Sequence, residues 1–239
     1  MIVTVIIPVY NEEKTIIKIL KKVNIQKKFF NLQIIVSNDG SNDKTINLLK
    51  KHKDLFDLLI NSKKNYGKGH AIQVARNRIK GKIILIQDAD LEYDPKDYKK
   101  LLKPIIEKKT NCVYGSRVLG RKSYFIPKNI NANFRILANF FLTFLSNLLN
   151  KQDLTDVHTC YKVIKMNVYN KINIFENSFS FCPELTTKLS LLKEKIVEVP
   201  INYHGRSVNA GKKIRFKDAL HAIRTILKIR ILYLYNGKI

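Results

Sequence analysis

The sequence has few cysteines, and they are not arranged for bridging or metal binding. Cys112, Cys160 and Cys182 are odd in number and lack the paired spacing of zinc ligands. We therefore expect neither a disulfide framework nor a structural zinc site, and a reducing cytoplasm fits this cysteine usage.

Export and membrane-spanning signals are also missing. The apolar run Val3–Ile7 has no basic leader or small-residue cleavage site, so it predicts a buried strand instead of a signal peptide. The apolar stretch Ile136–Leu149 has 14 residues, fewer than the roughly 20 that span a bilayer. We expect a core or interfacial helix there, and a cytoplasmic chain whose membrane contact, if any, is peripheral.

Acidic residues are scarce relative to basic ones. Lys and Arg number 44 against 19 Asp and Glu, which gives a formal net charge of +25. Such a charge attracts nucleic acids, nucleotide phosphates and anionic membranes, although a Lys-, Ile- and Asn-rich composition would also produce it without function. Because aromatic and basic residues do not interleave as in a nucleic-acid-binding module, we expect no nucleic-acid partner and keep that reading as a distant alternative.

The apolar pattern predicts an α/β fold. The chain has 239 residues, 45% of them hydrophobic, which suits one large domain, and it contains no internal repeat or low-complexity linker. Strands that alternate with helices favour a mostly parallel sheet with helices on both faces. The predicted strands are Val3–Val9, Gln33–Ser37, Leu58–Ile60, Ile83–Gln87 and Cys112–Gly115. The predicted helices are Glu12–Val23, Asp43–His52, His70–Ile79, Pro95–Lys109 and Ile136–Leu149.

The C-terminal segment predicts a basic amphipathic helix over Phe216–Tyr235. Its basic stripe consists of Lys217, His221, Arg224 and Lys228. Such a helix lies on an anionic membrane or packs on the core with a solvated basic face, and the sequence leaves both options open. We therefore divide the chain into a catalytic domain, residues 1–215, and this helix, residues 216–239.

Three acidic side chains follow the predicted strand Ile83–Gln87. Asp88, Asp90 and Glu92 alternate in the loop where the carboxyl end of a parallel sheet is open to ligands. Carboxylate oxygens suit Mg²⁺ or Mn²⁺, and a metal shared with a diphosphate would offset the charge on a leaving group. The cluster alone predicts a metal site only weakly, because loop carboxylates are often merely solvated.

Several motifs appear in an order that points to one family. They are Pro8–Glu12, Asn38–Asp43, Asn65–Gly69, Asp88–Glu92, Gly115–Arg117, Leu154–Tyr161 and Glu198–Tyr203. Together they cover most of the chain and resemble family-2 glycosyltransferases of the GT-A fold, a nucleotide-diphospho-sugar transferase fold. Within that family the chain is most similar to the dolichyl-phosphate mannose and glucose synthases.

The resemblance implies a set of donor-site residues. The nucleoside pocket would be lined by Pro8, Tyr10, Glu12 and Asp39, with Asp39 reading the base edge. Asp88, Ala89 and Asp90 would serve the diphosphate, and the metal ligands would be Asp88, Asp90 and Glu92. Asn38 departs from the Asp more common in the family, so position 38 receives no role.

Basic side chains are the candidates for phosphate binding. Lys68 lies between two glycines, where the backbone can approach a phosphate closely. Arg117, Arg135 and Arg206 would offer guanidinium groups to the donor and acceptor phosphates. By resemblance Asp156 faces the acceptor, where it orients the acceptor or acts as a base. The predicted catalytic residues are thus Asp90, Asp156 and Arg117.

The sequence therefore predicts an inverting hexosyltransferase with a divalent metal cofactor. The expected donor is UDP-glucose or GDP-mannose and the expected acceptor is a polyprenyl phosphate, with a membrane surface or membrane protein as a further partner. A glycan or other hydroxyl acceptor and a nucleotidyltransferase are the enzymatic alternatives. The glycines and basic residues of segments 205–206 and 211–213 predict a loop that closes over the diphosphate.

Overall fold

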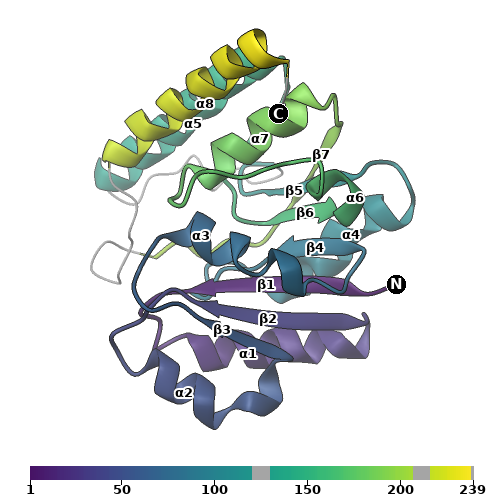
Figure 1. The fold of residues 1–239 in the computed structure, drawn as a ribbon, viewed down its shortest axis with the longest axis vertical. Helices are drawn as coiled ribbons and strands as arrows, with labels where there is room; N and C mark the ends of the chain where they lie inside the picture. The colour runs from purple at the N-terminus through teal and green to yellow at the C-terminus, as the bar shows by residue number, and fades with distance from the viewer. Residues whose placement is uncertain (120–129, 207–215, 238–239) are drawn as a thin grey trace.

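The computed structural model describes residues 1–119, 130–206 and 216–237, and the side chains of 130–135, 216–218 and 236 lie outside the description. In this part of the chain, one sheet of seven strands has the order β3-β2-β1-β4-β6-β5-β7 (Figure 1). The strands are β1 (Val3–Val9), β2 (Leu32–Asn38), β3 (Leu58–Asn61), β4 (Ile83–Ile86), β5 (Cys112–Ser116), β6 (Lys162–Lys165) and β7 (Ile196–Pro200). All neighbours pair in parallel except β6, which is antiparallel to β4 and β5. The predicted, mostly parallel sheet is confirmed.

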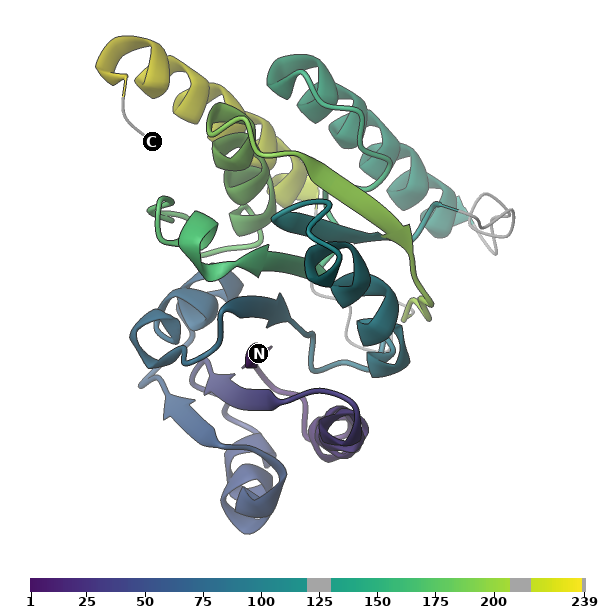
Figure 2. The ribbon, with the colours of Figure 1, turned by 90° about the vertical axis from the view of Figure 1, so that its right-hand side faces the viewer.

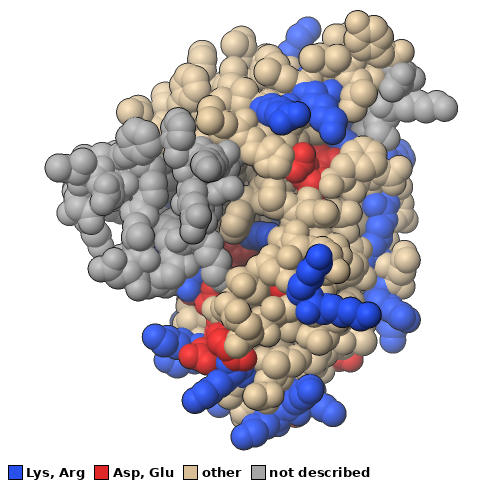
Figure 3. Space-filling model, turned by 60° about the vertical axis from the view of Figure 1, so that its left-hand side comes forward, with Lys and Arg blue, Asp and Glu red and all other residues tan. Residues whose placement is uncertain are grey.

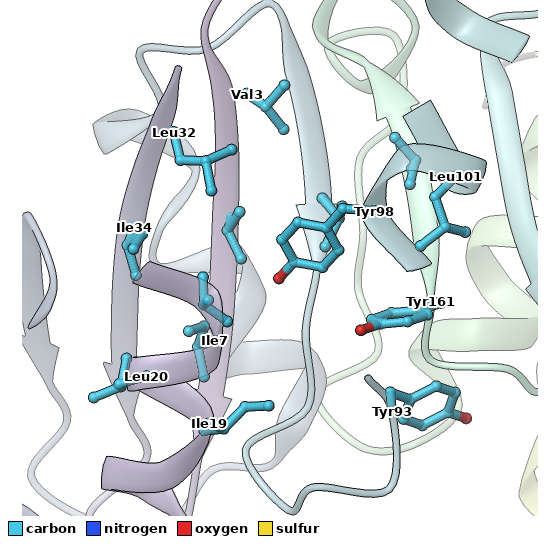
Figure 4. Packing of buried hydrophobic residues seen from close by; sticks show 14 of the residues in the cluster. Val3, Ile7, Ile19, Leu20, Leu32, Ile34, Tyr93, Tyr98, Leu101 and Tyr161 are labelled. Carbon is cyan, nitrogen blue, oxygen red and sulfur yellow. The ribbon is translucent and has the colours of Figure 1, made fainter. Parts of the chain in front are cut away.

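Helices cover both faces of the sheet. One face packs against α1 (Ile16–Ile25), α2 (Thr45–Lys51) and α4 (Tyr98–Ile106), and the other against α3 (Lys68–Gln73), α6 (Met166–Tyr169) and α7 (Phe181–Leu191). Figure 2 shows α1 and α4 on one side of the sheet and α3 and α6 on the other. The alternation along β1 explains this: Val5 and Ile7 join the core beside α1, whereas Ile6 joins the core beside α3. Figure 4 shows Ile7 in the same cluster as Ile19 and Leu20 of α1.

A further layer of two long helices lies outside α7. α5 (Ile130–Asn150) and α8 (Phe216–Asn236) run side by side and contact both each other and α7 (Figures 1 and 2). The sequence predicted only 14 residues of α5, whereas the helix has 21, so the predicted bounds were too narrow. None of the helices in the described residues is both long and apolar enough for a membrane crossing.

The predicted helices differ from the observed ones at their ends, and two of these differences bear on the site. The predicted helix Glu12–Val23 begins at Ile16, because Asn11 takes a left-handed backbone (φ 51°) and the Glu12 carbonyl accepts from the amides of Thr15 and Ile16 in a turn. The predicted helix His70–Ile79 begins earlier, at Lys68, and gives way to a 3₁₀ turn at Arg76–Arg78.

The sequence did not predict β6, because lysine stands at both ends of this four-residue strand. Lys162 is nevertheless buried. Its ammonium group donates to the Val157 carbonyl at 2.9 Å and lies 3.5 Å from the centre of the Tyr114 ring. Burial lowers the pKa of Lys162. The carbonyl and the ring therefore allow a lysine to occupy an interior strand.

Candidate active site

A pocket of about 180 Å³ lies where β1, β2 and β4 end, at the carboxyl edge of the sheet. Eleven of the residues predicted for the site line it: Pro8, Tyr10, Glu12, Asp39, Lys68, Asp88, Ala89, Asp90, Glu92, Arg117 and Arg206. A roomier groove of about 580 Å³ between α4 and β7 holds one carboxylate, Glu107, among lysines and apolar side chains. Only the smaller pocket gathers the acidic motif.

The acidic run is fixed by the end of β4. The Gln87 side chain, buried, accepts from the hydroxyls of Tyr98 at 2.9 Å and Tyr161 at 2.7 Å, which anchors the strand just before Asp88. The chain then turns, and Asp90 Oδ1 accepts from the Glu92 amide at 3.1 Å. Burial, then the nearby charges of Asp88 and Glu92, raise the pKa of Asp90 to about 7. Negative charge is therefore crowded at this edge.

Two side-chain cations neutralise much of this charge. Lys68 pairs with Asp88 and donates to Cys160 Sγ at 2.8 Å. Burial opposes the charge of Lys68, but Asp88 holds the pKa of Lys68 well above its usual value. Across the described residues, no three His, Cys, Asp or Glu side chains converge as a metal site in this arrangement. Asp88, Asp90 and Glu92 thus share the pocket without meeting at one point.

The second cation is Arg206, which spans three carboxylates. Its two terminal nitrogens lie 3.1 Å from the two oxygens of Glu12, and one of them is 2.8 Å from Asp90 Oδ2. Its backbone amide donates to Glu92 Oε1 at 2.6 Å. Arg206 therefore sits on the predicted metal ligands, although the sequence predicted that it binds acceptor phosphate.

Asp39 holds the neighbouring loop. Its carboxylate accepts from the amides of Tyr66 at 3.1 Å and Gly67 at 2.6 Å. Gly67 takes φ 111°, and a Cβ on Gly69 would lie 2.0 Å from the Glu176 carbonyl, so both positions require glycine. Asp39 thereby fixes the loop that carries Lys68 into the pocket.

Arg117 reaches the pocket from the end of β5, and Asp156 holds it from behind. Asp156 is fully buried and does not line the pocket; its Oδ2 accepts from Arg117 Nε at 2.6 Å and its Oδ1 from Arg117 NH2 at 2.7 Å. Burial would raise the pKa of Asp156, but Arg117 lowers it. Both oxygens of Asp156 are thus bonded to one guanidinium in this structure. The predicted role of Asp156 toward the acceptor, as an orienting group or a base, stays a prediction.

Sequence reasoning missed several side chains here. Glu198 on β7 accepts from the amides of Thr155 at 2.7 Å and Asp156 at 2.9 Å, which fixes the turn that carries Asp156. Tyr203 donates to Glu92 Oε2 at 2.9 Å. Both lie in the motif Glu198–Tyr203, which therefore carried a signal without assigned roles.

His158 also lines the pocket, and burial lowers its pKa to about 4. The remaining predictions lie outside the description. Nothing is described of the Arg135 side chain or of residues 211–213 in the predicted closing loop.

This sheet, with carboxylates at the ends of its strands, is the fold of GT-A glycosyltransferases. Comparison with known proteins gives the same result. The glucosyl-3-phosphoglycerate synthase of Mycobacterium tuberculosis, solved with Mn²⁺, UDP and glucosyl-3-phosphoglycerate, has the same fold with a TM-score of 0.68 at 16% identity, over 96% of this chain and 78% of that one. The profile of glycosyl transferase family 2 matches residues 4–172. The chain belongs to glycosyl transferase family 2.

Two relatives match nearly the whole chain. A dolichyl-phosphate beta-glucosyltransferase of Trichomonas vaginalis is 28% identical over 96% of this chain and 73% of its own length. An uncharacterized protein of Methanocaldococcus jannaschii is 30% identical over 92% of this chain and 91% of its own. The predicted family and fold are confirmed.

Proposed function

We propose that this glycosyltransferase moves a hexose from a nucleoside-diphosphate sugar, UDP-glucose or GDP-mannose, to a polyprenyl phosphate at a membrane surface. The observation that carries the proposal is one pocket that combines clustered carboxylates with an arginine held from behind by a buried aspartate. The similarity to a dolichyl-phosphate glucosyltransferase supports the lipid acceptor.

The donor side fits a divalent metal. Asp88, Asp90 and Glu92 offer hard oxygen ligands suited to Mg²⁺ or Mn²⁺, and they already hold Lys68 and Arg206 against them. When bound there, a divalent cation would offset the charge that develops on the departing diphosphate. Pro8 and Tyr10 would line the nucleoside end, and Asp39 would keep the Lys68 loop beside the diphosphate.

The acceptor side is built for an anion. Arg117 presents a guanidinium whose orientation is fixed by Asp156, and guanidinium forks match phosphate oxygens. An oxygen of the acceptor phosphate bonds to the anomeric carbon while the bond from that carbon to the diphosphate breaks, and the electron pair leaves with the nucleoside diphosphate. Configuration inverts. The acceptor is already an anion, so no side chain needs to remove a proton.

The outer surface of α5 supports contact with a membrane. Five large apolar side chains on this helix are at least half exposed: Leu137, Phe140, Phe141, Phe144 and Leu148. The polar side of the helix points inward instead, where Asn150 Nδ2 donates to Ser146 Oγ at 3.0 Å and to Thr187 Oγ1 at 3.2 Å. Exposed apolar area of this kind marks an interaction surface.

α8 extends this surface and adds basic charge. Its exposed apolar side chains are Leu220, Leu227, Ile231, Leu232, Leu234 and Tyr235, and Arg224 and Lys228 are exposed on the same helix. In Figure 3 the top of the molecule, over α5 and α8, is largely apolar or neutral, with basic groups beside it. An apolar surface next to lysine and arginine suits an anionic bilayer, the place of a polyprenyl phosphate.

The transfer is tested by the release of nucleoside diphosphate from UDP-glucose and GDP-mannose, with Mn²⁺ or Mg²⁺ and a short polyprenyl phosphate. We expect release that depends on the lipid with one donor, and its loss in Asp90→Asn. The exposed Asp54→Asn is the matched control and should keep the activity. Transfer to soluble sugars but not to the lipid would contradict the acceptor and favour a hydroxyl acceptor.

Membrane contact is tested by co-sedimentation with vesicles. We expect binding to vesicles that contain phosphatidylglycerol and weaker binding to phosphatidylcholine alone, with a clear loss in the double variant Phe140→Ser/Phe144→Ser. Phe29→Ser removes an equally exposed phenylalanine far from α5 and should bind as the unaltered protein does. Equal binding by all three proteins would contradict the assignment of this surface.

A further inference from the structure

Arg206 occupies the place at which the pocket's carboxylates approach one another. Its guanidinium contacts Glu12 and Asp90, and its Nε lies 3.9 Å from Glu92 Oε1. These three acids come from two loops, Glu12 from the loop after β1 and Asp90 and Glu92 from the loop after β4, and each is largely buried. Without a cation among them, their mutual repulsion would be unfavourable at this burial.

A divalent metal and this guanidinium compete for the same oxygens. A magnesium ion ligated by Asp90 would need oxygens at about 2.0–2.1 Å and room for the rest of its coordination shell. Arg206 NH2 lies 2.8 Å from Asp90 Oδ2, within that space. The pocket, at about 180 Å³, is also smaller than the roughly 300–1,000 Å³ of ordinary ligand sites. A metal bound at Asp90 Oδ2 therefore requires the Arg206 side chain to withdraw.

Of the two cations, Arg206 is the one arranged to leave. Lys68 is held on a loop that Asp39 fixes and that packs against the carbonyls of Glu176 and Asn177. The Arg206 side chain is 20% exposed, and its Nε is buried without a hydrogen-bond partner among the described residues. An incompletely satisfied guanidinium loses less on departure than one bonded at every nitrogen.

We propose that Arg206 is an exchangeable counter-ion: it holds Glu12, Asp90 and Glu92 together in the metal-free protein, and a divalent cation binds by displacing it. The proposal rests on the metal site of the proposed function and adds the group that yields to the metal. The apparent metal affinity is then lower than the intrinsic affinity, because only the molecules in which Arg206 has left the site can bind the metal.

The test is Mn²⁺ binding without nucleotide, followed by the electron paramagnetic resonance signal of free Mn²⁺. Arg206→Met removes the charge and keeps most of the side-chain length. We expect it to bind Mn²⁺ about tenfold more tightly than the unaltered protein, because the competing charge-assisted contacts are gone. Arg224→Met, an exposed arginine on α8, lowers the net charge equally and should leave the affinity unchanged. Asp90→Asn should abolish the binding.

The outcomes separate this proposal from the function on which it rests. Equal or weaker Mn²⁺ binding by Arg206→Met, in a protein with unchanged circular dichroism, would overturn the displacement, since the loss of a competing cation must strengthen Mn²⁺ binding at the same carboxylates. If the unaltered protein still binds Mn²⁺ and transfers hexose, the proposed function survives that result. Absence of Mn²⁺ binding in every variant would overturn the metal site itself, and the displacement with it.

Discussion

Arg117 and Arg206 enter the same pocket, but their surroundings differ. Among the contacts of the described residues, Arg117 meets one carboxylate, the fully buried Asp156, and uses Nε, NH2 and its backbone amide on that group. Arg206 spreads over several carboxylates at the pocket edge and is 20% exposed, against 11% for Arg117. Arg117 is held by both oxygens of one buried aspartate, whereas Arg206 bridges several carboxylates.

This difference is the basis for proposing that Arg206, and not Arg117, exchanges with a metal. Separating Arg117 from Asp156 would leave a buried, uncompensated charge, which is strongly unfavourable. Another cation can replace Arg206 at its carboxylates, because Glu12, Asp90 and Glu92 are buried together whereas the Arg206 side chain is more exposed. We therefore expect substitutions on the Arg117 side to lower stability. Substitution of Arg206 should instead raise the affinity for metal.

The largest effect is expected on the Arg117 side. Asp156→Ala should lower the free energy of unfolding by about 3–5 kcal/mol, because it leaves the Arg117 guanidinium buried without its partner. Urea denaturation followed by circular dichroism measures the change. The exposed Asp153→Ala serves as the control for the loss of an acid. A loss for Asp156→Ala no larger than for Asp153→Ala would show that the pair is not locked.

A pH effect on the same side comes from His158. Its pKa is about 4 in the folded protein against 6.5 ordinarily, so the unfolded chain binds more protons between these values and stability falls as the pH drops through this window. In His158→Gln that fall should be smaller by roughly 1–3 kcal/mol, with allowance for partial exposure. Denaturation curves at pH 7 and 4.5 measure it, with His52→Gln as control. Parallel curves for the two variants would contradict the prediction.

The sequence predicted most of the residues that line this pocket, for a simple geometric reason. β1, β2 and β4 are apolar runs that end in polar motifs, and parallel strands bring such ends to one edge. Which charges pair there could not be predicted. Arg206 meets Glu12 across 194 positions of sequence, and Asp156 meets Arg117 across 39, so these pairs depend on the whole fold.

The outer helix α5 shows a second limit. Periodicity predicted a helix around Ile136–Leu149 but not which side faces the core, and the structure buries Thr143 and Ser146 while leaving Phe140 and Phe144 exposed. The usual rule that apolar residues point inward fails on this helix. Similarly, the interior strand β6 was not predicted because it contains Lys162. Only the fold brings the partners of this lysine, a carbonyl and a tyrosine ring, close to it.

A smaller effect on the locked side should follow from Glu198. Glu198→Gln replaces one of two oxygens that hold the Thr155 and Asp156 amides, so the unfolding free energy should fall by about 1–2 kcal/mol. The exposed Glu107→Gln is the control. Because Glu198 acts through Asp156, the double variant with Asp156→Ala should lose less than the sum of the two single losses. Strict additivity would mean that Glu198 does not position Asp156.

The smallest stability change is expected for Arg206→Met. Removing the guanidinium leaves Glu12, Asp90 and Glu92 without it, but Asp90, whose pKa is already about 7, can take up a proton near neutral pH and relieve the repulsion. The Arg206 side chain is also partly exposed, so the unfolding free energy should change by less than about 1 kcal/mol. Urea denaturation without metal measures it beside Asp156→Ala. A loss for Arg206→Met as large as for Asp156→Ala would make the two arginines equivalent structural anchors, and the contrast between a fixed and an exchangeable arginine would be wrong.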